Sequence, residues 1–281
     1  MSADEVLAHG PAFAPPRPKD GQLDLRALTP ARVALERSGV SIATRHALEF
    51  SLAHAKARDA VHADLGAASL LAALRQRGLR AVSVHSAAGD RAEYLRQPDL
   101  GRRLSETSKA QLIAIAAQRS RGPGQAAVSI ILADGLSALA TERHALSVVD
   151  ALLPLLGAGD AASHSARWVL TPICVAEQAR VALGDEIGEV LAANVTAMLV
   201  GERPGLSSPD SLGAYITWAP RRGRTDAERN CVSNIRQPLA GQAGLDYADA
   251  AAKIAWYMGE GMRLGLSGVE IREADGPERL K

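Results

Sequence analysis

Three short apolar runs stand out in the second half of the chain. They lie in the segments "QAAVSIILADGLSALA", "WVLTPICVA" and "VTAMLV", and continuous apolar runs of this length are typical of strands buried on both faces of a parallel sheet. The first run ends at Asp134 and Gly135 and is followed by a helical pattern, and the second is followed by the helical segment "GDEIGEVLAAN". Strands that alternate with helices in this way predict an α/β fold with an open, mostly parallel sheet.

The apolar positions before these runs follow a helical spacing instead. Thr29 and Pro30 suit a helix cap and a first helical turn. The apolar residues that recur near helical spacing after them are Ala47, Leu48, Leu52, Ala55 and Ala60. This part of the chain therefore reads as a small helical region.

The chain divides into three parts on these patterns. Residues 1–28 are rich in proline and glycine, which cannot sustain a ladder of backbone hydrogen bonds, so we expect a flexible N-terminal arm. Residues 29–100 form the helical N-terminal region. Residues 101–281 form the main domain, which begins with a helix from about Ser105 and contains the three apolar runs.

Composition and charge exclude several classes of protein. The 281 residues are 47% hydrophobic, and 32 basic against 31 acidic side chains give a formal net charge of +1, which attracts neither nucleic acid nor an anionic membrane. No apolar run reaches the length of about 20 residues that a membrane span requires, and no secretory signal is present. The two cysteines, Cys174 and Cys231, are not paired in spacing, which indicates a reducing cytoplasm and no zinc site.

The most unusual segment is "GERPGLSSPDSLGAYITWAP", which follows the third apolar run. Its first residues, Gly201 to Gly205, leave a strand at the edge where open parallel sheets bind ligands. The glycines permit positive φ and close backbone approach, while Pro204 stiffens the turn, so the loop can present the carboxylate of Glu202 to a ligand. The alternative is an ordinary strand-end turn in which Glu202 pairs with Arg203.

Two other segments carry candidate binding residues. In "RVALGDEIGEVL", Val181 lies just before Asp185 and Glu186, two acids that also suit the positive end of a helix dipole. In isolation, Val181 would be assigned to the core.

The segment "TDAERNCVSNIR" gathers short polar side chains that suit hydrogen bonding to the amide groups of a ligand. These residues are Arg229, Asn230, Cys231, Ser233 and Asn234. Taken alone, Cys231 is more often a small buried apolar residue than a ligand contact.

No local signature of self-contained catalysis or metal binding is present. The chain lacks a Gly-x-Ser-x-Gly elbow, a His-Glu-x-x-His helix and a Cys-x-x-Cys pair. The motif Asp-x-His-x-x-Gly supplies a cobalt ligand in some cobalamin proteins, but Asp59, His62 and Gly66 fail its spacing on both sides. We therefore expect a binding role and no catalytic residue or metal ligand in this chain.

Six segments in this order resemble the small (light) subunit of ethanolamine ammonia-lyase. They are "TPARVALERSG", "YLRQPDLGRRLSE", "ILADGLSA", "RVALGDEIGEVL", "GERPGLSSPDSLGAYITWAPR" and "RNCVSNIR". The likeness extends from Thr29 to the final helix, and the long segment around Gly201 is the most specific.

The resemblance implies an adenosylcobalamin-dependent lyase that converts ethanolamine to acetaldehyde and ammonia. A large subunit with a TIM-type barrel would supply the substrate site, and the small subunit, a Rossmann-like α/β domain with a helical N-terminal part, would close the cobalamin site at the interface. The family assembles as a hexamer of heterodimers. Its cobalamin contacts correspond here to Val181, Glu202 and Cys231.

Two other functions stay open on the sequence alone. A self-sufficient Rossmann-like enzyme or sensor would hold a nucleotide ribose with Glu202, but "LADGLSALA" has too few glycines for the dinucleotide motif. A structural adaptor without a ligand would tolerate bulky residues in the Gly201 loop. We expect a cytoplasmic protein, either free or packaged in a bacterial microcompartment.

Overall fold

The computed structural model describes residues 25, 29, 31–120, 122, 124–157, 168–238 and 244–272. The chain divides into two units, residues 1–48 and residues 49–281. The expected arm, residues 1–28, lies outside the described residues apart from Leu25. In the first unit, strands β1 (Arg37–Ser38) and β2 (Ser41–Ile42) form an antiparallel hairpin whose turn contains Gly39 at φ +61°.

Helix α2 (Thr44–His62) begins in the first unit and continues into the second. The other helices are α3 (Ala67–Gln76), α4 (Arg91–Arg96), α5 (Glu106–Ala117), α6 (Ala138–Leu156), α7 (Leu183–Val190) and α8 (Tyr247–Leu264), with the 3-10 turns η1 (Leu100–Arg102) and η2 (Asp226–Glu228). Four of them begin at a side chain that accepts a backbone N–H bond three residues on, namely at Asp90, Ser105, Ser137 and Asp246. No helix within the described ranges is long and apolar enough to cross a membrane.

The second unit is built on a sheet of seven strands, counted over the described residues. The strands are β3 (Ala81–His85), β4 (Ala126–Ala133), β5 (Trp168–Leu170), β6 (Ile173–Glu177), β7 (Val195–Gly201), β8 (Leu212–Trp218) and β9 (Asn230–Ile235). Their order is β3-β6-β4-β7-β8-β9, and β5 pairs with β4. Strands β3 to β7 pair in parallel, whereas β8 and β9 are antiparallel to their neighbours. The prediction of an α/β fold with a mostly parallel sheet is confirmed.

Two details of the sheet differ from the expected pattern. The run "WVLTPICVA" forms two strands, because the chain leaves the sheet at Thr171 and Pro172, and proline has no N–H for a ladder. Strand β3 lies within the segment for which helices were expected. The division of the chain at residues 28 and 100 stays a prediction.

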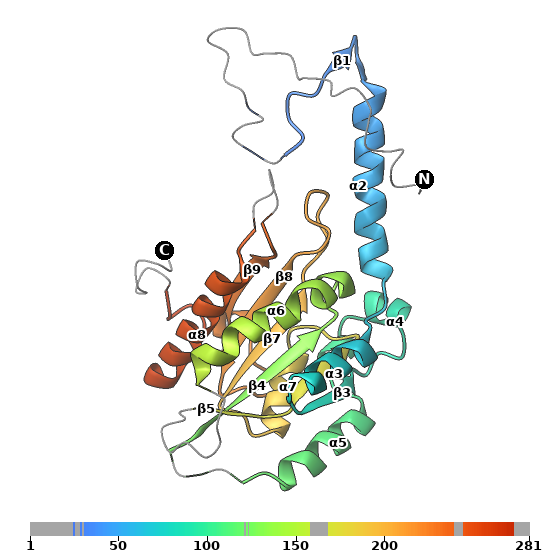
Figure 1. The fold of residues 1–281 in the computed structure, drawn as a ribbon. Helices are drawn as coiled ribbons and strands as arrows, with labels where there is room; N and C mark the ends of the chain where they lie inside the picture. Colours follow the sequence, from blue (N-terminus) through green and yellow to red (C-terminus); the bar gives the residue numbers. More distant parts are fainter. Residues whose placement is uncertain are drawn as a thin grey trace. The chain divides into compact units, whose positions relative to one another are not determined.

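Both faces of the sheet are covered by helices, as Figure 1 shows. Along β4, Ile130 and Leu132 pack with α3, α6 and α8 on one face, whereas Ile131 and Ala133 pack with α5 and α7 on the other. All eight residues of β4 are buried, as expected for a continuous apolar run.

The carboxyl ends of β4, β6 and β7 meet at one edge of the sheet, because these three strands are parallel neighbours. Helices α6 and α7, which follow β4 and β6 in the chain, lie on opposite faces. Open α/β sheets bind their ligands beyond the carboxyl ends of strands at such a point. The fold therefore directs attention to the loops that leave these three strands.

Candidate functional site

A cavity of about 440 Å³ lies at this edge of the sheet. It is lined by Tyr94, Gly135, Leu136, Ala179, Arg180, Val181, Val200, Gly201, Glu202, Arg203 and Tyr215. Two of the three residues predicted to contact a ligand, Val181 and Glu202, are therefore brought together from segments that are separate in the sequence. The third, Cys231, lies directly opposite Tyr215 in the pairing of β8 with β9.

The loops after β4 and β7 are in direct backbone contact. The N–H of Leu136 donates to the carbonyl oxygen of Gly201 over 2.9 Å. A Cβ at Gly201 would lie 2.0 Å from the carbonyl oxygen of Ser137, so only glycine fits there. Gly201 therefore serves close approach, as expected, but neither it nor Gly205 has a positive φ.

Glu202 does not form the ion pair with Arg203 that the alternative interpretation required. Within the described residues its carboxylate accepts the backbone N–H of Asn234, at 3.3 Å to each oxygen. The side chain lies over Gly213 of β8, where a Cβ would come within 3.1 Å of Oε1. Glu202 is half-buried and lines the cavity, so strands β8 and β9 hold its carboxylate at the site.

Cys231 and Tyr215 form a neutral pair beside Glu202. Cys231 is exposed as a residue, so the alternative of a buried apolar cysteine describes Cys174 and not Cys231. Its thiol is hydrogen-bonded to Tyr215; partial desolvation raises the pKa of the thiol, the bond to Tyr215 opposes this, and the charge of Glu202 adds to it. Desolvation, followed by the neighbouring Cys231, also raises the pKa of Tyr215. Both groups are protonated at neutral pH, which suits hydrogen bonding and not nucleophilic attack.

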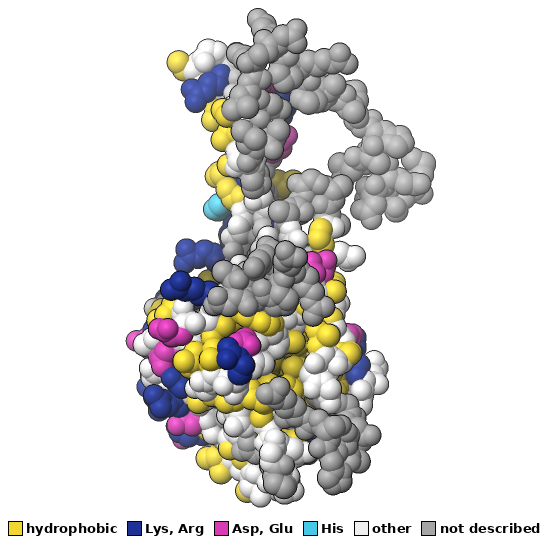
Figure 2. Space-filling model, turned by 90° about the vertical axis from the view of Figure 1, so that its left-hand side faces the viewer, with side chains coloured by type: hydrophobic (Ala, Val, Ile, Leu, Met, Phe, Trp, Pro, Cys, Tyr) yellow, Lys and Arg dark blue, Asp and Glu magenta, His cyan; other side chains and the backbone are white. Residues whose placement is uncertain are grey.

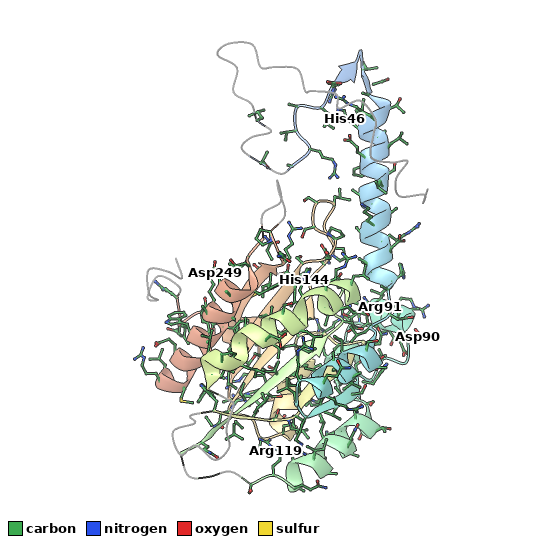
Figure 3. The ribbon with its side chains drawn as sticks, in the orientation of Figure 1. His46, Asp90, Arg91, Arg119, His144 and Asp249 are labelled. Carbon is green, nitrogen blue, oxygen red and sulfur yellow. The ribbon has the colours of Figure 1, made fainter. Side chains whose placement is uncertain are left out.

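The buried carboxylate of Asp134 holds the loop that carries Val181. Asp134, at the end of β4, is 1% exposed and accepts the backbone N–H groups of Gln178 at 2.7 Å and Ala179 at 2.9 Å. Arg91, at the start of α4 (Figure 3), donates to Asp134 at 3.2 Å and to the carbonyl oxygen of Gly135 at 2.9 Å. Burial raises the pKa of Asp134 to about 6, although the hydrogen bonds and Arg91 act against the rise.

Tyr94, a residue of α4, contacts the same two loops. It is 1% exposed, and its hydroxyl lies 2.8 Å from the carbonyl oxygen of Gly135 and 3.2 Å from that of Ala179. The guanidinium groups of Arg91 and Arg180 lie 4.7 and 4.6 Å from the centre of its ring, a cation–π geometry. The turn around Val181 is therefore held by hydrogen bonds and ring contacts before any ligand arrives.

Most of the remaining polar candidates of the sequence have structural partners, whereas Ser233 is exposed on β9. The side-chain amide of Asn230 exchanges hydrogen bonds with Gly268, and its Nδ2 also donates to the carbonyl oxygen of Ile271. Asp185 and Glu186 do lie in the first turn of α7, as predicted. Asp185 pairs with Arg229, and the carboxylate of Glu186 accepts the backbone N–H of Leu104 at 2.8 Å.

Sequence reasoning missed four residues that shape the site: Tyr94, Asp134, Gly213 and Tyr215. A signal existed for Asp134, since an acid directly after a buried strand often bonds to neighbouring backbone N–H groups. Tyr94 and Tyr215 act through contacts with segments far away in the sequence, which no local pattern reveals.

The arrangement suits the binding of a ligand. Among the described residues, no cluster of His, Cys, Asp or Glu could hold a metal ion. A fixed carboxylate, a neutral hydroxyl and a neutral thiol around an apolar side chain suit a ligand that carries both apolar surface and amide groups.

Comparisons of this sequence with a family model and with known proteins identify the same family. The family model for the ethanolamine ammonia-lyase light chain matches residues 19–272. An ethanolamine ammonia-lyase small subunit from Xanthomonas campestris is 51% identical over 261 residues, which cover 92% of this chain and 90% of the relative. The small subunits from Bradyrhizobium diazoefficiens (51% identical; 92% and 93% covered) and Pseudomonas aeruginosa (49% identical; 89% and 86% covered) are similar to nearly the same extent. The chain therefore belongs to the ethanolamine ammonia-lyase light chain family.

Proposed function

We propose that this chain is the small subunit of an adenosylcobalamin-dependent ethanolamine ammonia-lyase, which converts ethanolamine to acetaldehyde and ammonia. The observation that carries the proposal is the convergence of Val181 and Glu202 on one cavity, with Cys231 bonded to the lining residue Tyr215. These three residues come from three separate segments: the loop after β6, the loop after β7 and strand β9.

The residues present fit one side of a corrin. The amide groups at the rim of a corrin are donors and acceptors, and Glu202 can accept from them. The Tyr215–Cys231 pair, which uses one of its two protons in its own hydrogen bond, has one proton left to donate. Val181 is half-buried and supplies apolar surface between these polar groups. Because Asp134 and Tyr94 hold the loop of Val181 in place, little conformational entropy is lost when the ligand binds.

The size of the cavity supports a shared site. At about 440 Å³ it is too small to enclose a cobalamin, so a second chain would have to cover most of the cofactor. In this proposal the large subunit provides that cover and the substrate site. The bound cofactor supplies the radical that removes a hydrogen atom from the substrate, while this chain orients the corrin and excludes water from one side.

Several finer features belong to the same proposal. They are the Rossmann-like character of the main domain, the division of the chain into an arm, a helical region and a main domain, and the assembly of six heterodimers. Residence in the cytoplasm, free or within a microcompartment, belongs with them.

The test is to co-express the chain with its large subunit and to measure ammonia release from ethanolamine with added adenosylcobalamin. We expect release that requires both subunits and the cofactor. A complex that forms but neither binds cobalamin nor releases ammonia would refute the proposal.

A further inference from the structure

A second cavity, of about 710 Å³, lies next to the turn that carries Val181. The two cavities share no lining residue, but Val181 lines the first and Ala182 lines the second. The second cavity is lined by Asp99, Arg102, Arg103, Ala182, Arg222, Gly223, Arg224, Thr225, Asp226 and Arg229. Five of these ten residues are arginines, so this concave surface is strongly basic.

One wall of this cavity is the segment around η1. It is tied to the turn of Val181 by the N–H of Arg180, which donates to the carbonyl oxygen of Gly101 over 2.8 Å. The N–H of Leu104 donates to the buried carboxylate of Glu186 over 2.8 Å. The backbone that carries Arg103 is therefore held on both sides.

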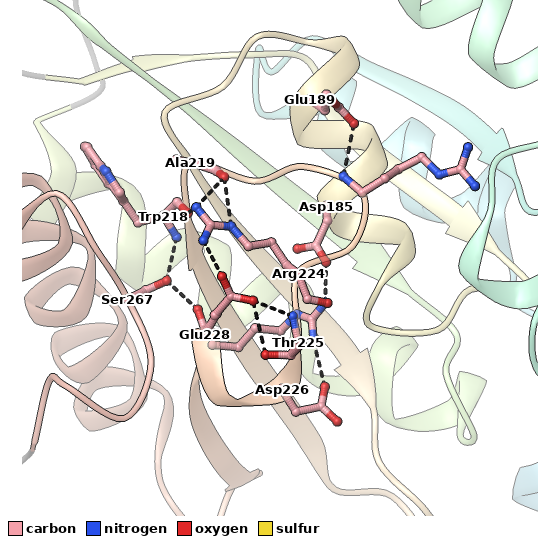
Figure 4. Close-up of polar contacts among 11 residues, drawn as sticks. Asp185, Glu189, Trp218, Ala219, Arg224, Thr225, Asp226, Glu228 and Ser267 are labelled. Carbon is pink, nitrogen blue, oxygen red and sulfur yellow. Dashed lines mark hydrogen bonds and ion pairs between the residues drawn. The ribbon is translucent and has the colours of Figure 1, made fainter.

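A second wall is formed by the loop between β8 and β9, and Figure 4 shows its contacts. Arg224 donates to the carbonyl oxygens of Trp218, at 3.2 Å, and Ala219, at 3.0 Å, and pairs with Glu228. The N–H of Arg222 donates to the carboxylate of Glu189 over 3.1 Å. This loop is fixed by its own hydrogen bonds, so the wall exists before a ligand binds.

Two arginines of the cavity, Arg103 and Arg222, form no ion pair with an acidic side chain of the described residues. Arg102 pairs with Asp99, Arg224 with Glu228, and Arg229 with both Asp185 and Asp226. Within the described part of the chain, no acidic side chain pairs with the guanidinium groups of Arg103 and Arg222, one on each wall. Arg229 is 7% exposed, and its Nε has no hydrogen-bond partner among the described residues. The cavity thus presents guanidinium donors that the chain itself does not satisfy.

We infer that this cavity binds a phosphate group, with Arg103 and Arg222 as its principal donors. Guanidinium groups recognise phosphate oxygens through paired, charge-assisted N–H bonds, and two such groups that line one cavity can bind the oxygens of the same tetrahedral anion. The phosphate can come from two sources. One is a free phosphate or nucleotide; the other, which rests on the proposed function, is the phosphodiester in the nucleotide loop of a cobalamin whose corrin lies against Val181 in the adjoining cavity.

The experiment uses the full chain in complex with its large subunit, as the parent and as the R103Q/R222Q double variant. Glutamine keeps much of the side-chain length but removes the charge. The control is R75Q/R263Q, which removes two charges from exposed residues of α3 and α8 that do not line either cavity. Binding of inorganic pyrophosphate is measured by calorimetry in the absence of cobalamin. Binding of cobalamin and of cobinamide, which has a corrin but no nucleotide loop or phosphate, is measured by absorbance.

Two results would support the inference. If R103Q/R222Q weakens cobalamin by about tenfold or more, leaves cobinamide unchanged and the control variant behaves like the parent, the phosphate is that of the cofactor. If the double variant weakens pyrophosphate to a similar extent but leaves the preference for cobalamin over cobinamide unchanged, the phosphate is a free one.

Two results would overturn it. The first is that neither pyrophosphate affinity nor the preference for cobalamin over cobinamide changes in R103Q/R222Q. The second is that the double variant loses the large subunit while its pyrophosphate affinity matches the parent, which would make the cavity a protein-docking surface. Failure of the parent complex to bind cobinamide would refute the proposed corrin site, and the pyrophosphate measurement would still decide the function of this cavity.

Discussion

At the scale of single residues, the site depends on the room that β8 leaves for Glu202. Gly213 has no side chain, and the carboxylate of Glu202 occupies the space above it while accepting the N–H of Asn234. The carboxylate therefore has one backbone partner and lone pairs left for a ligand. Because the carboxylate of Glu202 is held in this way, the turn after β7 presents a fixed hydrogen-bond acceptor.

The contribution of Glu202 can be measured by removing it. Loss of one charged partner of a hydrogen bond costs roughly 1.5 to 3 kcal/mol, so Glu202→Ala should weaken cobalamin binding to the complex by about tenfold to a hundredfold. Glu202→Gln keeps one acceptor oxygen and should weaken it less. Glu260→Ala, on α8 and paired with Arg263, is the control and should leave affinity unchanged. Parent-like affinity in both Glu202 variants, measured by absorbance titration, would show that Glu202 does not contact the cofactor.

Gly213 provides an independent test of the same geometry. A Cβ at this position would meet Oε1 of Glu202 at 3.1 Å and Cγ at 3.2 Å, so Gly213→Ala should displace the carboxylate by a few tenths of an ångström. We expect the affinity for cobalamin to fall severalfold while the fold is retained. Gly259→Ala, in α8 with nothing within 4 Å of the added Cβ, should keep full affinity and stabilise the helix by roughly 1 kcal/mol. Equal affinities of the two variants would contradict this account.

At the scale of elements, Asp134 joins the ends of two strands, β4 and β6, to helix α4. This carboxylate follows β4, bonds to the loop after β6, and receives Arg91 from α4. A hydrogen-bonded carboxylate in an apolar setting is rigid, but its burial opposes ionisation and raises its pKa from 3.8 to about 6. The site is therefore positioned by a group that titrates close to neutral pH.

The raised pKa of Asp134 makes the free energy of unfolding depend on pH in a definite direction. Between the ordinary pKa of 3.8 and the folded value of about 6, the folded chain binds more protons at Asp134 than the unfolded chain does. Its contribution is thus fully present below the ordinary value and is lost as the pH rises through about 6. Relative to Asp134→Asn, the free energy of unfolding of the parent should fall by roughly 1 to 3 kcal/mol between pH 4.5 and 7.5. Urea denaturation of both proteins across this range measures the difference, and a constant or rising difference would show that the pKa of Asp134 is not raised.

The sequence predicted those elements whose pattern is local. The run through β4 is apolar at every position because helices cover both its faces, and this pattern indicates a buried parallel strand without further knowledge. Strand β3 has only five residues with alternating burial, and such a short signal next to helices is not distinctive. The antiparallel addition of β8 and β9 was not visible either, since pairing direction is a property of the fold and not of a run. For the site, Glu202 was recognisable from its loop, whereas Tyr215 acquires its role only by pairing with Cys231.

At the scale of the whole molecule, the described surface of the second unit combines exposed apolar side chains with an open cavity at the sheet edge. Figure 2 shows a broad group of hydrophobic side chains on one face of the second unit, with charged side chains among and beside them. The cavity at the sheet edge is open to solvent, and at about 440 Å³ it can cover only part of a ligand as large as a cobalamin. A large ligand bound from one side retains much of its exposed surface, which limits affinity.

The isolated chain should therefore bind cobalamin weakly and should not release ammonia from ethanolamine. Calorimetric titration of the chain without its large subunit measures the affinity, and the complex provides the comparison. We expect binding in the complex to be tighter by at least about a hundredfold, because the second subunit removes the remaining corrin surface from water. Affinity in the micromolar range or better for the chain alone would mean that the site is complete without a partner.

The cobalt of the bound cofactor should keep its own dimethylbenzimidazole as the lower ligand. None of the described histidines lines the cavity at the sheet edge. His85 ends β3 and its Nδ1 bonds to the carbonyl oxygen of Ser86 at 2.8 Å, while Nδ1 of His144 lies 2.9 Å from the hydroxyl of Tyr247. His62 is the last residue of α2, and the residues around it do not have the spacing of the cobalt-binding motif. The chain thus offers no described imidazole to displace the base.

The complex is labelled uniformly with nitrogen-15, loaded with unlabelled cofactor and converted to cob(II)alamin. We expect an axial superhyperfine pattern from nitrogen-14 in its electron paramagnetic resonance spectrum, because the coordinating atom belongs to the cofactor. A nitrogen-15 pattern would show that a protein histidine has replaced the base.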